Sequence, residues 1–231
     1  MVSNDIYDYE VDRVNQPTRP LPSGKITVRQ ATTFSIILLL LGLVSSLELG
    51  FANLGIAALF ALIGWYYNYR GKQSGLFGNS LVALSLAIPY IFGSIALGNY
   101  SINLAYLLAL TSFLAGMGRE VLKGVSDVEG DRIRNVRTVA LVRGTGLAKT
   151  LSAIFFLLAV GSSVLPLVFG LLGKATDLYV VLILIPDGIF LYLSYRVLKV
   201  KNVGETPKLK SVALGGMMLG LIVYLLSGLV I

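Results

Sequence analysis

Long apolar segments alternate with short polar ones along the whole chain. Windows of about 19 residues mark seven candidate membrane-spanning segments. Their ranges are 31–49, 52–67, 77–97, 102–118, 147–172, 178–195 and 211–231. Each approaches the roughly 20 residues that an α-helix needs to cross the hydrocarbon core of a bilayer. The pattern therefore predicts an all-α fold, a polytopic bundle of transmembrane helices in a lipid bilayer.

The composition narrows the available chemistry. Of 231 residues, 55% are apolar and only 13% are charged, whereas soluble domains carry about 25% charged residues. The chain contains no cysteine and no histidine. This excludes thiolate and imidazole nucleophiles, disulfides and the usual zinc ligands. Any catalysis must use carboxylates, amides, hydroxyls, lysine or arginine.

The basic residues define an orientation. When the seven segments alternate in direction, every Lys and Arg except Lys174 falls on one side of the membrane. The positive-inside rule makes that side cytoplasmic, and it places the protein in the cell membrane as a multi-pass protein. The same asymmetry accounts for the net charge of +7, so we expect no nucleic acid as a partner.

Eight of the twelve acidic residues gather in two clusters on the predicted cytoplasmic side. In the first cluster, Asn4, Asp8 and Asp12 recur every four residues, so a helix stacks their side chains on one face beside Asp5. In the second, a continuous helix would keep Glu120, Asp127 and Asp131 within roughly 40° of one another. Each of the two patterns therefore predicts a set of oxygen ligands that converge on one face of a helix.

Crowded carboxylates need a cation, and hard oxygen ligands suit Mg²⁺, which often shares its coordination with substrate phosphates. Basic residues suited to a diphosphate occur on the same side of the membrane. They are Arg19, Lys25, Lys72, Arg119 and Lys123. The alternative interpretation is that each cluster is an exposed run of charge beside a membrane span.

Two further features have structural interpretations. Asp187 lies within the sixth segment beside Pro186, and intramembrane carboxylates usually face a cavity or a partner. We interpret it as a structural residue. The aromatic run that starts at Trp65 is interpreted as an interfacial anchor rather than a stabiliser of a carbocation.

Three motifs resemble the UbiA superfamily of intramembrane prenyltransferases, and the resemblance covers the whole chain. The residues from Asn4 to Asp12, followed by Arg19-Pro20-Leu21-Pro22-Ser23-Gly24, resemble its first aspartate-rich motif. Tyr67-Asn68-Tyr69-Arg70-Gly71-Lys72 with Gly78-Asn79 resembles a connection between two of its helices. Arg119-Glu120-x-x-Lys123 leading to Asp127-x-Glu129-Gly130-Asp131 resembles the second motif, in the form seen in digeranylgeranylglyceryl phosphate synthases of archaeal lipid synthesis.

The resemblance implies a single transmembrane prenyltransferase domain over residues 1–231, with cytoplasmic motif-bearing segments at 1–30 and 119–149. The family has nine transmembrane helices, so a chain with seven is expected to lack the first two. Gly124 occupies a position where many relatives carry an aspartate, so one metal ligand is absent or is replaced by Glu120 or Glu129.

The resemblance also implies roles for individual residues. The metal ligands would be Asn4, Asp5, Asp8, Asp12, Glu120, Asp127 and Asp131, with Asp8, Asp12, Asp127 and Asp131 essential for catalysis. The substrate-binding residues would be Arg19, Lys25, Lys72, Asn79, Arg119 and Lys123. With Mg²⁺ as cofactor, a geranylgeranyl group would pass from geranylgeranyl diphosphate to geranylgeranylglyceryl phosphate.

Three other functions remain open from the sequence. One is a prenyltransferase of the same family that acts on an aromatic quinone precursor or another acceptor. A second, of a different class, is a divalent-cation transporter whose acidic clusters form a vestibule. The third is a non-catalytic remnant of the family.

Overall fold

The computed structural model describes residues 2–99, 103–128, 131 and 136–230. Within these ranges the chain forms α-helices and short 3-10 turns and no strands, which confirms the all-α fold. Seven helical segments in the described part are long and apolar enough to cross a bilayer. The chain is therefore a multi-pass membrane protein. The predicted segment ends at Ile102 and Ile231 lie outside the described residues.

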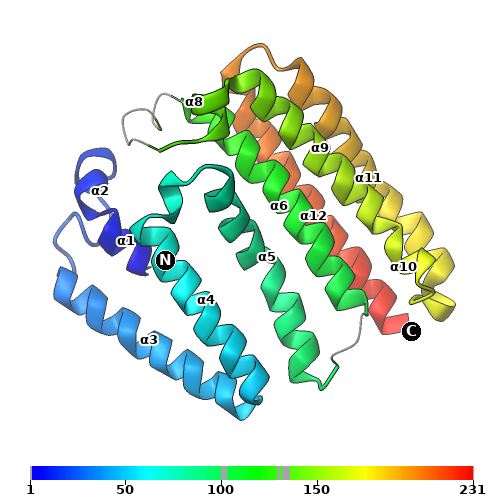
Figure 1. The fold of residues 1–231 in the computed structure, drawn as a ribbon, viewed down its shortest axis with the longest axis horizontal. Coiled ribbons are helices and arrows are strands. Elements are labelled where there is room, and N and C mark those ends of the chain that lie inside the picture. Colours follow the sequence, from blue (N-terminus) through cyan, green and yellow to red (C-terminus); the bar gives the residue numbers. More distant parts are fainter. Residues whose placement is uncertain (1, 100–102, 129–130, 132–135, 231) are drawn as a thin grey trace. The chain divides into compact units, whose positions relative to one another are not determined.

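The chain forms two compact units, residues 1–72 and 73–231. The single domain expected over residues 1–231 stays a prediction. In the first unit, the short helices α1 and α2 precede the long helices α3 and α4, and α1 packs against both long helices (Figure 1). The bounds are Val2–Tyr7 for α1, Tyr9–Asn15 for α2, Val28–Glu48 for α3 and Phe51–Tyr69 for α4.

Local sequence signals set the ends of α3. The Thr27 hydroxyl accepts a hydrogen bond from the Gln30 backbone N–H, and the Gln30 side chain accepts one from the Thr27 N–H. This capping box satisfies two of the free N–H groups at the start of the helix. Only Leu49 and Gly50 separate α3 from α4, and Gly50 has a φ of 124°, which favours glycine. The tight turn makes α3 and α4 neighbours.

The second unit contains the other five long helices. They are α5 (Leu76–Ala96), α6 (Leu104–Ser126), α9 (Thr145–Ser163), α11 (Thr176–Lys199) and α12 (Thr206–Val230). The short elements are α8 (Val139–Arg143), α10 (Leu165–Val168), η2 (Gly173–Ala175) and η3 (Val203–Glu205), and η1 (Gly71–Gln73) joins the two units.

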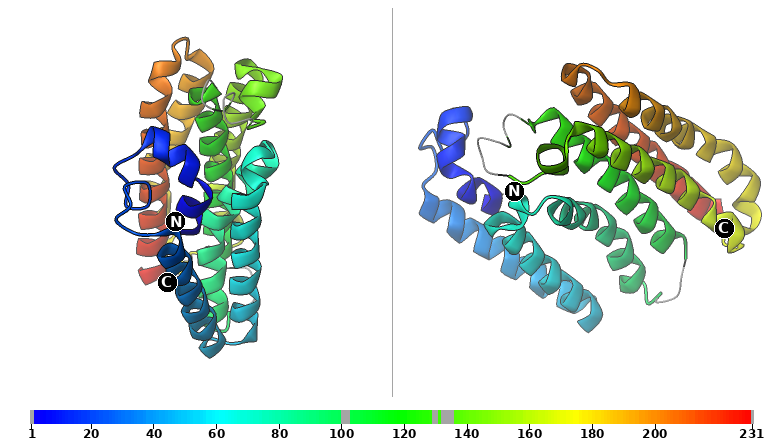
Figure 2. Two further views of the ribbon diagram at one scale, coloured as in Figure 1. Left: turned by 90° about the vertical axis from the view of Figure 1, so that its left-hand side faces the viewer. Right: turned by 45° about the horizontal axis from the view of Figure 1, so that its top comes forward.

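Helix α6 is the central element of the second unit. It packs against α5, α9 and α12, while α11 packs against α9 and α12 (Figures 1 and 2). Small residues allow these close approaches, as is common between membrane helices. A Cβ atom on Gly118 would lie 2.8 Å from the ring of Phe156, which is fully buried. Gly118 is therefore required for the contact between α6 and α9.

Most helix ends lie within about five residues of the hydropathy prediction, and two differ by more. The fourth segment was expected to end at residue 118, but α6 continues to Ser126. The charges of Arg119 and Glu120 end an apolar window, although a helix can keep such residues when they pair with each other. The fifth segment was expected to be continuous to residue 172, but it breaks after Ser163, and Pro166 lies in the first turn of α10.

Basic side chains gather at one end of the second unit, where α6 and α11 end and α9 and α12 begin. There the Lys149 ammonium donates a hydrogen bond to the Val200 carbonyl at 2.6 Å, and Lys210 lies 3.9 Å from Asp127. Lys174 lies in η2, directly before α11 begins, so it lies at the end of that helix opposite to these basic side chains. The described part of this unit therefore agrees with the predicted alternation of its helices.

Candidate active site

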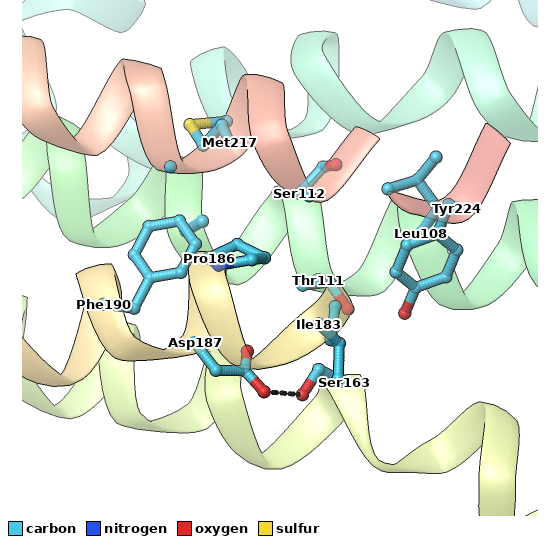
Figure 3. A pocket seen from close by; sticks show the side chains of 13 residues that line it. Leu108, Thr111, Ser112, Ser163, Ile183, Pro186, Asp187, Phe190, Met217 and Tyr224 are labelled. Carbon is cyan, nitrogen blue, oxygen red and sulfur yellow. Dashed lines mark hydrogen bonds between the residues drawn. The ribbon is translucent and has the colours of Figure 1, made fainter. Parts of the chain in front are cut away.

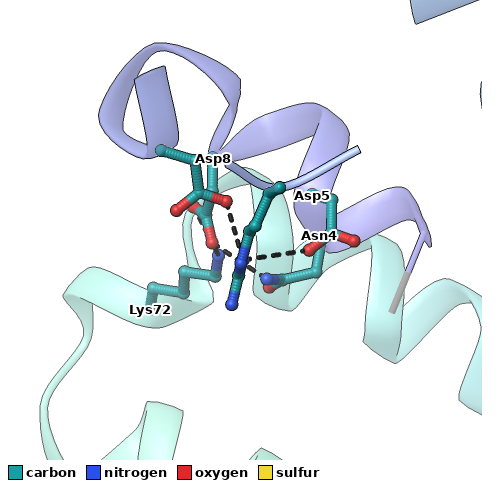
Figure 4. Close-up of polar contacts among 6 residues, drawn as sticks. Asn4, Asp5, Asp8 and Lys72 are labelled. Carbon is teal, nitrogen blue, oxygen red and sulfur yellow. Dashed lines mark hydrogen bonds and ion pairs between the residues drawn. The ribbon is translucent and has the colours of Figure 1, made fainter. Parts of the chain in front are cut away.

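The first acidic cluster is formed by residues of α1 and α2 together with Lys72, which lies three residues after the end of α4. Asn4 donates a hydrogen bond to Asp8 at 2.9 Å, as their helical spacing predicts. The ammonium of Lys72 lies 2.8 and 2.7 Å from the two carboxylate oxygens of Asp8. Figure 4 shows Asn4, Asp5, Asp8 and Lys72 directed toward one another. Residues 64 positions apart in the sequence thus form one polar group.

Arg19 binds Asp5 and Asp12, the other two aspartates of this cluster. Its guanidinium donates to Asp12 at 2.7 Å and to Asp5 at 3.4 Å. Only 9% of the Asp12 side chain is exposed, so this pair is partly shielded from water. The turn that carries Arg19 is held by its backbone bond to Gln16 and by Leu21, which is 4% exposed. The Pro-rich segment therefore fixes the position of the arginine.

The helical face of the cluster is slightly irregular. Asp8 lies between α1 and α2 with φ −89° and ψ 4°, so the predicted single helix is interrupted there. The backbone bonds from Asp8 to Asn4 and from Asp12 to Asp8 are nevertheless kept at 2.9 and 2.8 Å. The stacking of the three side chains therefore survives the interruption.

Two predicted substrate-binding residues lie outside this group. Lys25 is exposed, and within the described part of the chain it forms no ion pair with Asp5, Asp8 or Asp12. Asn79 belongs to α5 in the second unit, where it is half-buried and its backbone N–H bonds to Gly75. Roles for both residues stay predictions.

The second motif is built around a buried carboxylate. Only 7% of the Glu120 side chain is exposed, and it accepts a hydrogen bond from Arg119 at 2.8 Å and lies 3.7 Å from Lys123. All three residues belong to the last turns of α6. In this arrangement Glu120 holds two cations that were predicted to bind substrate. Its predicted role as a metal ligand is not tested by these contacts.

The continuous helical face predicted for Glu120, Asp127 and Asp131 ends at Ser126. Asp127 caps α6 and lies 3.9 Å from Lys210, a partner from α12. Asp131 is half-buried and its backbone N–H bonds to the Asp127 carbonyl. Glu129, Arg132 and Arg134 lie outside the described residues. A helical hydrogen bond thus links the two aspartates, but α6 ends before them, so Glu120 does not share one continuous helix with them.

Gly124, the position that departs from the motif, packs against the loop that follows the motif. A Cβ atom there would lie 3.3 Å from the Cβ of Thr138, and Gly124 is buried. Thr138 in turn caps α8 by accepting a hydrogen bond from Leu141. Glycine at this position is therefore matched to the threonine that covers it.

Some residues near the motifs were not singled out from the sequence. The sequence shows Lys210 only as one of the basic residues on the predicted cytoplasmic side. Its proximity to Asp127 depends on how the helices pack. A groove of about 380 Å³ is lined by residues 73–76 of the turn before α5 and by residues of the α8 region. Arg137 and Arg143 line it. Gly75 has a φ of 61°, and a Cβ there would lie 2.5 Å from the Arg137 carbonyl oxygen, so the groove wall requires glycine.

The donor chemistry of the first cluster fits a hard divalent cation. It offers three carboxylates and an amide oxygen, the ligand types that Mg²⁺ prefers. Among the described residues, however, no three acidic side chains are arranged as a ready metal site. Their oxygens instead contact Lys72 and Arg19. If Mg²⁺ binds here, Asn4, Asp5, Asp8 and Asp12 would hold it, and their role as ligands stays a prediction.

The fold and these motifs define a membrane-embedded enzyme that transfers prenyl groups. The model of the UbiA prenyltransferase family matches residues 1–225, and the chain belongs to this family.

Relatives of known name are similar over nearly the whole chain. A digeranylgeranylglyceryl phosphate synthase of Archaeoglobus fulgidus is 36% identical over 95% of this chain and 75% of its own length. One from Korarchaeum cryptofilum is 36% identical over 97% of this chain and 79% of its own length. A solved structure from work on digeranylgeranylglyceryl phosphate synthase in membranes is 33% identical, with a TM-score of 0.84 over all of this chain and 80% of that one.

Proposed function

We propose that this chain transfers a geranylgeranyl group from geranylgeranyl diphosphate to geranylgeranylglyceryl phosphate, in the synthesis of archaeal ether lipids. One observation carries the proposal: Asp8 and Asp12 each contact a cation, at 2.7 Å, within a single acidic cluster. Such a set of oxygens and cations can bind a metal together with a diphosphate. The names of the relatives support the choice of donor and acceptor.

In the proposed reaction the bond between C1 of the prenyl chain and the diphosphate oxygen breaks, and a bond from the acceptor hydroxyl to C1 forms. Bound Mg²⁺ would supply positive charge that stabilises the departing diphosphate. Asn4, Asp5, Asp8 and Asp12 would hold one ion, and Asp127 and Asp131 another. Arg19 and Lys72 would donate hydrogen bonds to the diphosphate oxygens.

The second motif is proposed to bind the acceptor. Arg119 and Lys123 would hold its phosphate, and Glu120 would position both cations through the contacts at 2.8 and 3.7 Å. The acceptor hydroxyl loses its proton to a carboxylate, to diphosphate or to water. Apolar helices around the prenyl chain would exclude bulk water, which otherwise traps an allylic cation. The motif-bearing face would be the cytoplasmic face of the cell membrane.

The test is product formation by the purified chain. Geranylgeranyl diphosphate and Mg²⁺ are supplied with a mixture of geranylgeranylglyceryl phosphate and aromatic quinone precursors, and products are separated by mass. A Mg²⁺-dependent diether phosphate is the expected product. A prenylated aromatic compound would contradict the proposed acceptor, and flux of divalent ions into sealed vesicles without any product would contradict the proposed reaction.

A further inference from the structure

A small cavity lies inside the helix bundle of the second unit, between α6, α9, α11 and α12. It encloses about 20 Å³, which suffices for one occupant the size of a water molecule. Thr111, Ser112, Ser163, Pro186, Asp187 and Tyr224 contribute to its wall. Figure 3 shows the carboxylate of Asp187 beside Ser163 in this wall. The cavity is therefore polar although apolar helices surround it.

The cavity is separate from the second motif. Thr111 and Glu120 belong to the same helix, nine residues apart, which places them about 14 Å apart along its axis. Asp187 is the twelfth of the 24 residues of α11, about 17 Å from the first residue along the helix axis. The carboxylate therefore lies near the middle of a membrane-spanning helix.

Asp187 has no cationic partner in the part of the chain that the structure describes. None of the residues that line the cavity is a lysine or arginine, and none of the ion pairs in the described part of the chain includes Asp187. Its contact is with the Ser163 hydroxyl, at 2.7 Å. That hydroxyl also lies 2.7 Å from the Val160 carbonyl, and one hydrogen cannot serve both acceptors fully. The carboxylate is left with unused acceptor capacity.

Two further oxygen atoms near the cavity lack a regular hydrogen bond. The Tyr224 side chain is buried, with 4% of the residue exposed, and its hydroxyl forms no hydrogen bond of good geometry among the described residues, although the Tyr179 and Thr111 hydroxyls lie near it. Pro186, which lines the cavity, has no N–H, so the Leu182 carbonyl one turn earlier in α11 lacks its usual helical donor. An unsatisfied polar atom inside a membrane protein is costly. Together with Asp187 these oxygens form a set of acceptors that lacks a positive charge among the described residues.

We propose that this cavity binds one Na⁺ ion, coordinated by Asp187 and by neutral oxygens from the surrounding helices. A single carboxylate balances one positive charge, whereas a divalent ion would leave a buried excess. The small volume favours Na⁺ over the larger K⁺. In other membrane proteins, backbone carbonyls that lack helical hydrogen bonds coordinate ions near the membrane midplane; α11 itself continues through Pro186. The ion joins four helices at a point remote from the motifs, so it stabilises the bundle.

Thermal unfolding of the purified full chain in detergent tests the proposal. Unfolding midpoints are compared in NaCl, KCl and choline chloride at equal ionic strength. Na⁺ is expected to raise the midpoint saturably, by about 5–10 °C at 100 times its dissociation constant. Asp187→Asn is expected to abolish this response, and Tyr224→Phe to weaken Na⁺ binding. Asp177→Asn, an exposed aspartate in the first turn of the same helix, is the matched control and keeps the response.

Equal midpoints in the three salts would overturn the proposal, because a protonated carboxyl or a bound water needs no Na⁺. A full Na⁺ response in Asp187→Asn would overturn it as well. If that variant does not fold, binding of radioactive Na⁺ to the wild-type chain decides: one saturable site per chain supports the proposal, and no saturable binding refutes it. Neither measurement uses prenyl transfer, so the outcome is independent of the proposed reaction.

Discussion

Replacement of Glu120 by glutamine separates two roles for the second motif. The sequence predicts Glu120 as a metal ligand, whereas in the structure it binds Arg119 at 2.8 Å and lies 3.7 Å from Lys123. Glutamine keeps the size and one acceptor oxygen but removes the charge. If Glu120 positions the two cations, the variant loses stability and binds the acceptor phosphate less well. If Glu120 is a metal ligand, the variant needs more Mg²⁺ for the same rate.

The size of the stability loss follows from burial. Breaking a fully buried ion pair costs about 3–5 kcal/mol, and a hydrogen bond to a charged group contributes about 1.5–3 kcal/mol. The Glu120 side chain is 7% exposed, but Arg119 is 29% and Lys123 is 51% exposed, so water screens both partners. A loss of about 2 kcal/mol is therefore expected. For a chain of this size it lowers the unfolding midpoint by about 4–8 °C.

Glu205→Gln is the matched control for this measurement. Glu205 binds Arg196 at 3.0 Å, but both side chains are more than 40% exposed, so the loss stays below about 1 kcal/mol. Unfolding is measured by a thermal scan, and the rate is measured against acceptor and Mg²⁺ concentrations. Glu120→Gln is expected to raise KM for the acceptor without changing the Mg²⁺ requirement. Equal unfolding midpoints for the two variants would refute the argument from burial, and a raised Mg²⁺ requirement would refute the positioning role.

Three further predictions test the first motif and the helix packing. Asp8→Asn removes the charge bound to Lys72 and is expected to slow turnover at least about 10²-fold. Its control is Glu10→Gln, which is expected to keep a rate near wild type because the Glu10 side chain is 77% exposed and pairs only with Arg13 in the described part of the chain. Equal rates for the two variants would exclude Asp8 from the site. Chelation of divalent ions is expected to abolish product formation and added Mg²⁺ to restore it, as measured in the mass-resolved assay; turnover in the chelator would contradict the metal requirement. Gly118→Ala places a Cβ 2.8 Å from Phe156 and is expected to lower the free energy of unfolding by about 1–3 kcal/mol. Gly161→Ala, whose Cβ would meet no atom within 4 Å, is expected to leave it unchanged. A thermal scan compares the two variants.

The long helices could be predicted because each is an uninterrupted apolar run, but some of their ends could not. Hydropathy ended the fourth segment at residue 118, since a charged residue counts against a span whatever its contacts are. In the structure Glu120 is buried and paired with neighbours on its own helix, so α6 continues to Ser126. Helix ends that carry paired charges are therefore underestimated by a hydropathy window.

Contacts between neighbouring residues of the motifs could be predicted from the sequence, whereas contacts between residues far apart in the sequence could not. The spacing of Asn4 and Asp8 predicted their contact, which is confirmed at 2.9 Å. The pairs Asp8–Lys72 and Asp127–Lys210 join residues more than 60 positions apart. No local pattern determines such pairs, because they depend on how the helices pack. The sequence could name Lys72 as a substrate-binding candidate but could not identify the carboxylate that holds it.

These ion pairs have a consequence for substrate binding. Asp8 and Asp12 use oxygens to bind Lys72 and Arg19 that they would also need as metal ligands. If these residues hold a metal and a diphosphate together, each carboxylate would exchange a cation for the metal, and each cation would gain a diphosphate oxygen. The number of charge-assisted hydrogen bonds would then be largely conserved. A metal alone would displace the cations without offering them new acceptors. On the proposed assignment of these residues, the ion pairs would favour joint binding of metal and diphosphate over binding of the metal first.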